Sequence, residues 1–348
     1  MTQTPPVILS DVDDVRPLRN RSLEAVEDAR TVDEMLAAAA RIPGALRPGG
    51  VGTLALWEVL ATVAARDLAL ARALEPHLDA VAILEQSSTT PSDLAAVVEH
   101  PARATWGVFA AEAPGLRVEA QPAADGTARL TGTKPWCSLA DRLSAALMTA
   151  HLPGGGRGLF AVDLRHAGVA VSDEPWAARG LVEISSTSVT FTDVPAVPVG
   201  EPGWYLSRPG FAWGGAGVAA CWYGGAVGLA RTMAERLEER SDADLLMMHL
   251  GDVDEHLRAA RAVLAETATA VSCGEPTKTA TARARATVAR TCERVLRASA
   301  HALGPAPLTL DADHAKRVAD LEIYVRQHHA ERDLASLGRA ALAAGAPW

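Results

Sequence analysis

Residues 127–136 (TARLTGTKPW) begin the stretch that decides the fold, because they start a run of short β-type segments in an otherwise helical chain. The run continues through 144–152 (SAALMTAHL), 158–164 (GLFAVDL), 168–172 (GVAVS) and 186–194 (STSVTFTDV). These segments are β-branched or alternating, and Gly, Pro and Asp residues separate them, as is typical of strands joined by turns. The sequence therefore predicts a compact β domain over residues 103–200.

Helical patterns flank this β domain on both sides. Residues 22–86 carry apolar side chains at three- and four-residue spacing, interrupted at 48–50 (PGG). Four further helical patterns, typical of an up-down bundle, follow at 228–240, 252–272, 277–303 and 313–343. We therefore expect an α+β multi-domain chain with an N-terminal helical domain (1–102), a central β domain (103–200) and a C-terminal four-helix bundle (201–348).

The composition and the first residues limit which binding partners and which cellular compartment we expect. The 348 residues include 33 Lys and Arg against 42 Asp and Glu, a net charge of -9, which argues against binding to a nucleic acid backbone. The four cysteines lie far apart without a C-x-x-C pair, and we expect them to be reduced and buried, with no metal site. The first residues resemble no signal peptide, so we expect a cytoplasmic protein.

Residues 211–230 (FAWGGAGVAACWYGGAVGLA) leave two interpretations open. The segment has no charge and is long enough to span a bilayer. It is mostly Gly and Ala, however, and nothing else in the chain resembles a second span. The composition favours a buried helix that packs closely on its neighbours, and we expect no membrane partner.

Two apparent motifs are better explained without a ligand. The glycine-rich run 153–158 (PGGGRG) lacks the Lys-Ser/Thr of a phosphate-binding loop and lies between two strand patterns, which favours a hairpin loop. His328 and Glu331 lie one helical turn apart, as metal ligands can, but a di-iron bundle needs this spacing on two helices. No pattern for a hydrolase, a zinc protease or a dinucleotide-binding fold is present in the sequence.

Three stretches resemble the acyl-CoA dehydrogenase family: 48–53 (PGGVGT), 130–138 (LTGTKPWCS) and 180–195 (GLVEISSTSVTFTDVP). The resemblance implies a central β-barrel-like domain, with flavin adenine dinucleotide between it and the bundle. It places Trp136 and Ser138 against the flavin ring. This assignment is chemically reasonable, because an indole can cover the ring face and a hydroxyl can bond its polar edge.

The chain departs from the family's other flavin-binding stretches. The T-E-P-x-x-G-S-D loop is represented by 111–116 (AEAPGL), which keeps Glu112 but has no Gly-Ser-Asp. The Arg-x-x-Phe-Gly-x-Pro run retains only Arg240, and the Q-x-H-G-G-x-G run retains His301 and Gly304. The resemblance therefore implies Glu112, Arg240 and His301 as further cofactor-binding residues.

The chain differs most from the family at the position of the catalytic base. The family usually carries a Glu in a Y-E-G-T turn, and His328 occupies that place in the stretch 327–330 (QHHA). The family's alternative Glu position falls near Val218 and is also without a carboxylate. A histidine can act as a base near neutral pH, so His328 is a candidate, with Glu331 as a second. A solvated polar stretch at a helix end explains the same residues without catalysis.

Three functions follow from the resemblance. The first is an FAD-dependent oxidoreductase that dehydrogenates an acyl-CoA or acyl-carrier thioester, with electron-transfer flavoprotein or another acceptor as its partner. The second is a non-catalytic subunit of a hetero-oligomeric acyl-CoA dehydrogenase, and the third is a flavin monooxygenase. The resemblance also implies a homodimer or homotetramer.

Overall fold

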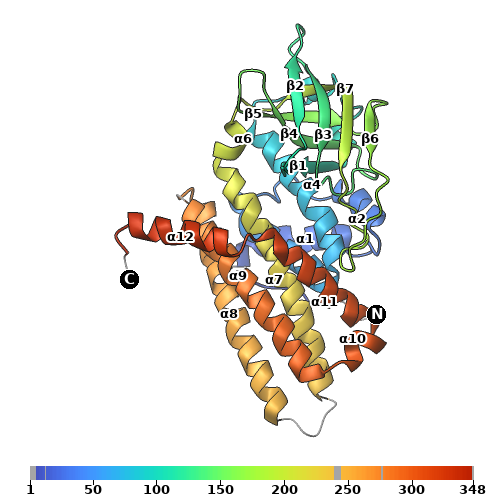
Figure 1. Cartoon of the computed structure of the whole chain (residues 1–348). Helices are drawn as coiled ribbons and strands as arrows, with labels where there is room; N and C mark the ends of the chain where they lie inside the picture. The colour runs from blue at the N-terminus through green and yellow to red at the C-terminus, as the bar shows by residue number, and fades with distance from the viewer. Residues whose placement is uncertain (1–4, 12, 239–243, 276, 347–348) are drawn as a thin grey trace.

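The strands lie at one end of a helical assembly in the computed structural model, which describes residues 5–11, 13–238, 244–275 and 277–346 (Figure 1). The helical elements that precede the sheet are η1 (Asp13–Val15), α1 (Arg16–Val26), α2 (Val32–Ala39), α3 (Gly52–Arg66), α4 (Leu68–Gln86), α5 (Pro91–Leu94) and η2 (Pro101–Arg103). Helix α4 packs against β1 (Trp106–Phe109) of the sheet and against α7 (Pro209–Glu238) of the bundle. It thereby connects the two parts of the molecule.

The long apolar pattern between residues 50 and 86 forms two helices, α3 and α4. Asp67 has extended backbone angles between them, and its carboxylate accepts hydrogen bonds from the Ala69 and Leu70 amides. An acidic N-cap of this kind satisfies donors that a new helix leaves free. The local capping residue therefore ends one helix and begins the next.

Seven strands of the described chain form one sheet. The remaining strands are β2 (Val118–Pro122), β3 (Ala128–Lys134), β4 (Ala145–His151), β5 (Arg157–Asp163), β6 (Val169–Val171) and β7 (Val189–Pro198). The pairings β4–β2, β2–β3, β3–β7, β7–β5 and β5–β4 close a ring, while β1 pairs with β4 and β6 with β7. The expected barrel-like β structure is confirmed.

Helices after the sheet form the bundle. They are α6 (Trp204–Ser207), α7, α8 (Asp244–Ser272), α9 (Lys278–Leu303), α10 (Ala306–Leu310), α11 (Ala312–Tyr324), η3 (Val325–Gln327) and α12 (Glu331–Ala343). Segment 211–230 lies inside α7, and no helix within the described residues is long and apolar enough to cross a membrane. A Cβ on Gly224 of α7 would lie 2.1 Å from the Ala61 carbonyl oxygen, so α7 packs directly on α3.

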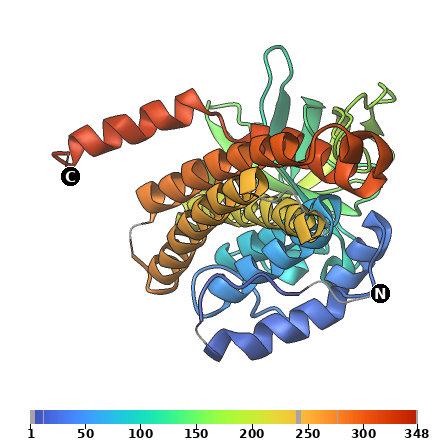
Figure 2. The same ribbon diagram turned by 90° about the horizontal axis from the view of Figure 1, so that it is seen from below.

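The last predicted helix, 313–343, is interrupted. Helix α11 ends at Tyr324, and α12 begins at Glu331 after a turn in which Ala330 has φ 42°. Figure 2 shows α12 projecting away from the rest of the chain, and it has no buried residue. Buried Tyr324 and Val325 hold the end of α11 in the core, so the chain turns at the boundary between core and surface.

Candidate functional site

Trp136 and Ser138 lie on the turn that follows β3, where the sheet meets α4, α11 and the segment 180–188. The Leu181 amide donates to the Asp320 carboxylate of α11 at 2.6 Å. A Cβ on Gly180 would lie 2.0 Å from the Ala319 carbonyl oxygen, which leaves room for glycine alone. The turn and α11 are thereby brought to one junction, which is the candidate site.

The turn itself holds a strained backbone. Trp136 and Leu139 have φ angles of 58° and 59°, in the left-handed region that residues with a side chain rarely adopt. Hydrogen bonds from the Cys137 and Leu139 amides to the carbonyls of residues 187 and 185 fix this geometry. As a result the Trp136 indole is 59% exposed, although the residues beside it are buried. Such strain is common at binding sites.

Ser138 connects this turn to α4. Its hydroxyl accepts a hydrogen bond from Arg72 Nη2 at 3.0 Å and lies 2.7 Å from the Ser186 hydroxyl. The Arg72 guanidinium lies 5.8 Å from the centre of the Tyr324 ring and 3.9 Å from the Glu75 carboxylate. Burial raises the pKa of Glu75 to about 7, so this carboxyl is partly protonated at neutral pH.

Aromatic and cationic side chains continue the cluster across the bundle. The Trp222 ring of α7 meets the rings of Tyr324 and His328 edge to face, at 6.2 and 6.4 Å between centres. Arg285 of α9 places its guanidinium 4.8 Å from the centre of the same indole. The cluster therefore joins four helical or turn segments around one indole.

His328 is the candidate base that the structure places in this cluster. Its side chain is only 8% exposed, and burial lowers the pKa of the imidazole below its usual value of 6.5. The Nε2 atom lies 3.6 Å from the Asp333 carboxylate, beyond hydrogen-bond range. His328 is therefore a neutral imidazole at pH 7, able to accept a proton.

Several buried polar atoms in the cluster lack a hydrogen-bond partner. Within the described residues, no hydrogen-bond partner meets Arg72 Nη1, Trp222 Nε1 or His328 Nε2. The Tyr324 hydroxyl lies beside the Cys221 thiol, and burial raises the pKa of both groups. Since buried polar groups in folded proteins are almost always paired, this cluster has the character of a ligand site.

The other predicted site residues lie elsewhere. Glu331 is exposed at the start of α12. Glu112 is engaged by Lys134 at 2.7 Å, by Arg157 at 3.2 Å and by His151 at 3.4 Å, within an ion-pair cluster on the sheet. His301 packs against His249 and lies 16 residues beyond Arg285, which is about 24 Å along α9. Arg240 lies outside the described residues.

The cavities differ in character. A cavity of about 590 Å³ lies between α9, α10 and α11 and includes Leu296, His314 and Arg326, but none of the predicted site residues. The space between α4 and the Ser138 turn, lined in part by Arg72, has a volume of about 10 Å³. The protein's own side chains therefore nearly fill the space between α4 and the Ser138 turn. No group of His, Cys, Asp and Glu in the described ranges is arranged to hold a metal ion.

The sequence analysis missed Arg72, Glu75, Trp222 and Arg285. One signal was available: Arg72, Glu75 and Asp79 recur at helical spacing on a pattern whose other buried positions, except His77, are apolar. Arg285 had no such signal, because it lies in an arginine-rich stretch of α9 whose other arginines are exposed.

Comparisons with known proteins agree with this architecture. Residues 202–328 match the family model described as "Acyl-CoA dehydrogenase, C-terminal domain". A search of curated proteins finds no match.

Solved structures cover nearly the whole chain. Butyryl-CoA dehydrogenase from Megasphaera elsdenii is 17% identical, with a TM-score of 0.80 over 96% of this chain and 99% of its own. Dibenzothiophene monooxygenase from Paenibacillus sp. A11-2 is 20% identical, with a TM-score of 0.75 over 93% and 94%. Electron transferring flavoprotein of Acidaminococcus fermentans is 15% identical, with a TM-score of 0.73 over 91% and 94%.

Identities this low establish the fold and leave the reaction open, because one fold hosts many activities. The expected fold class and family resemblance are both confirmed. The chain therefore has the fold of acyl-CoA dehydrogenases along its length, and its residues 202–328 match that family's C-terminal domain.

Proposed function

We propose that the chain is a flavin-dependent oxidoreductase in which His328 is the base that accepts the substrate's proton. The observation that supports this most directly is the buried, neutral imidazole whose Nε2 atom has no hydrogen-bond partner among the described residues. A proton-transfer group needs both a free lone pair and a pKa near or below the working pH. His328 has both, and Trp222 joins it to the cluster that contains Ser138.

The side chains of the junction fit a flavin ring. An exposed indole, Trp136, and a hydroxyl, Ser138, lie on one rigid turn, and the cation Arg72 beside them has an unpartnered nitrogen. In our proposal Trp136 covers the ring and Ser138 bonds its polar edge. The bound flavin would supply the hydride acceptor. FAD is the proposed form because the family resemblance implies it; FMN is bound by the Paenibacillus relative.

The proposed reaction is α,β-dehydrogenation of an acyl thioester. His328 would take the α proton, and burial around it would exclude water from the reacting carbon. Glu331 is the weaker candidate for this role, because it is exposed at the start of α12. Electron-transfer flavoprotein as the acceptor, and assembly as a homodimer or homotetramer, are parts of the same proposal.

The test uses His328→Gln with His329→Gln as its matched control, since the neighbouring His329 side chain is 63% exposed. The purified chain should show the visible spectrum of a bound flavin, bleached anaerobically by a panel of acyl-CoA thioesters. His328→Gln should keep the flavin and lose about 100-fold or more in turnover. His329→Gln should stay within about twofold of the original.

The pH profile adds a second readout. Because burial lowers the pKa of His328, the free base persists below pH 6.5, and kcat/KM should decline only under that pH. Unchanged turnover in His328→Gln would remove this residue from the proposal. A chain without flavin after reconstitution would contradict the function itself, and activity restored by a co-expressed subunit would favour a hetero-oligomeric half-site.

A flavin monooxygenase is the second candidate, and the polar character of the site favours it. The cluster offers a neutral imidazole and two guanidinium groups, and the space between α4 and the Ser138 turn has a volume of only about 10 Å³. Oxygen uptake coupled to a flavin reductase, with no reduction by acyl-CoA, would support oxygenation over dehydrogenation.

A further inference from the structure

Positive charge in the candidate site exceeds the negative charge that faces it. Arg72 of α4 and Arg285 of α9 flank the rings of Tyr324 and Trp222. Within the described residues, the one carboxylate that comes within 4 Å of either guanidinium is Glu75, at 3.9 Å from Arg72. Arg285 instead donates to the carbonyl oxygens of Gly215 and Gln327. The carboxylates of Asp333 and Glu75 act on Arg285 from longer range, and within the described residues no direct ion pair neutralises its charge.

Hydrogen-bond donors are also in excess. Arg72 Nη1 and Trp222 Nε1 have no hydrogen-bond partner among the described residues, and the Trp222 side chain is fully buried. Water could satisfy a donor but would leave two guanidinium groups of which only Arg72 has a carboxylate, Glu75, within 4 Å in the described residues. An anionic acceptor would satisfy both demands.

We propose that the Arg72–Arg285 cluster binds a carboxylate group of the substrate. The inference rests on the proposed function and narrows its substrate class to small molecules that carry a carboxylate. A guanidinium presents parallel donors that match the two oxygens of a carboxylate. The carboxylate would take the Arg72 contact that Glu75 now makes at 3.9 Å.

Glu75 therefore competes with the ligand for Arg72. The charged or titratable groups that act on it, or on which it acts, are Arg72, Asp79, Tyr205, Cys221, Arg285 and Tyr324. Since the pKa of Glu75 is raised to about 7, its charge appears as pH rises through 7. Affinity for a carboxylate should then decrease above pH 7, and Glu75→Gln should remove that decrease.

The experiment measures calorimetric binding of succinate and of its uncharged analogue succinamide to the flavin-loaded full chain. Succinate should bind at least tenfold more tightly. Arg72→Gln should abolish this preference, and Arg285→Lys, which keeps the charge, should retain more of it than Arg285→Gln. Arg290→Gln is the control, because this arginine is exposed on the same helix as Arg285. Circular dichroism confirms that each variant is folded.

The outcomes separate this inference from the proposed function. A flavin-loaded chain that binds succinate and succinamide equally would overturn the carboxylate site and leave the oxidoreductase intact. So would a preference that survives in Arg72→Gln, or inorganic phosphate that competes as well as succinate. A chain that never binds flavin, but prefers succinate in the unloaded form, would overturn the oxidoreductase and retain the carboxylate site.

Discussion

Glu75 shows how a single residue acquires its chemistry from the fold. In the sequence it is one acid among 42 Asp and Glu residues. In the structure it is buried between α4 and the bundle, with Arg72 and Arg285 as the cations that act on it. Burial disfavours the charged form more than these arginines favour it, so the net shift in pKa is upward.

Replacing Glu75 with Gln should change how stability depends on pH. The pKa is about 7 in the folded chain and 4.5 ordinarily, so between these values the folded state binds more protons than the unfolded state. Stability of the original chain therefore falls as pH rises from 4.5 to 7, by about 3 kcal/mol at most, and then levels off. Urea denaturation at several pH values should show that the free energy of unfolding of Glu75→Gln rises, relative to that of the original chain, as pH increases from 4.5 to 7.

Glu85→Gln is the control for this measurement, because Glu85 lies on the same helix with a side chain that is 38% exposed. The free energy of unfolding of that variant should follow the original chain at each pH. Identical pH slopes for Glu75→Gln and the original would show that Glu75 is already ionised when the protein is folded.

At the scale of elements, the close contact of α7 with α3 explains the glycine-rich sequence of 211–230. A Cβ at position 224 meets the backbone oxygen of Ala61 at 2.1 Å, which neither helix can avoid without moving apart. A Cβ at position 217 of the same helix meets Leu60 Cδ1 at 3.7 Å, an ordinary contact. Glycine is therefore required at 224 and dispensable at 217.

Gly224→Ala should destabilise the chain by about 3 kcal/mol, because overpacking forces the helices apart. Gly217→Ala should be neutral or stabilising by up to about 1 kcal/mol, since alanine favours helix. The midpoint of urea unfolding measures both. Equal midpoints for the two variants would mean that the α3–α7 contact is loose enough to accept a methyl group.

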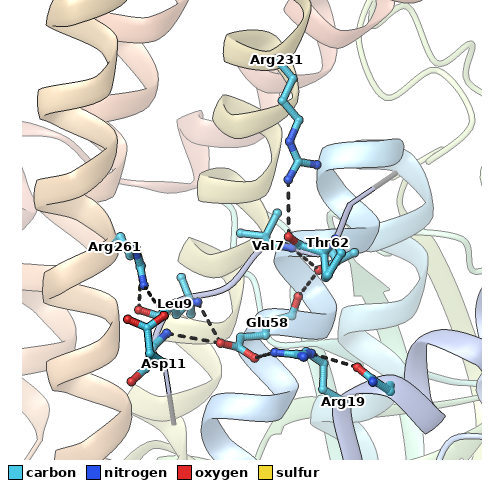
Figure 3. Close-up of polar contacts among 11 residues, drawn as sticks. Val7, Leu9, Asp11, Arg19, Glu58, Thr62, Arg231 and Arg261 are labelled. Carbon is cyan, nitrogen blue, oxygen red and sulfur yellow. Dashed lines mark hydrogen bonds and ion pairs between the residues drawn. The ribbon is translucent and has the colours of Figure 1, made fainter. Parts of the chain in front are cut away.

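At the scale of the whole molecule, an extended N-terminal segment ties distant helices together (Figure 3). The Leu9 amide donates to the buried carboxylate of Glu58 on α3 at 2.8 Å, and Arg19 of α1 donates to the same carboxylate at 2.8 Å. Arg261 of α8 donates to the Leu9 carbonyl oxygen at 3.0 Å. One carboxylate thus joins α1, α3 and the segment that reaches the bundle.

Glu58→Gln should weaken this connection across the molecule. The change leaves the buried Arg19 guanidinium without its counter-ion, at a cost of about 3 kcal/mol. Hydrogen exchange at the Leu9 amide should accelerate along with the loss in global stability. Glu24→Gln, at an exposed position of α1, should change neither quantity. Unchanged exchange at Leu9 in Glu58→Gln would show that the segment is held by apolar packing.

Local patterns were enough to predict the order of helices, sheet and bundle, and the resemblance to acyl-CoA dehydrogenases. Alternation in 127–194 and helical spacing on either side are properties of neighbouring residues, so they are visible without a fold. The break at residues 325–330 was missed, because it depends on Tyr324 and Val325 entering the core while α12 does not. The domain boundaries remain a prediction.

The residues of the candidate site also fall into two groups, those that local patterns predict and those that they do not. Trp136, Ser138 and His328 were predicted because they lie in motifs, whereas Arg72, Glu75 and Arg285 come from helices with no motif at those positions. Only the tertiary structure decided that these residues meet around Trp222. Contacts between residues about 200 positions apart leave no pattern among neighbours in the sequence. The sequence by itself determined the elements and their order, and packing determined which charges would be buried together.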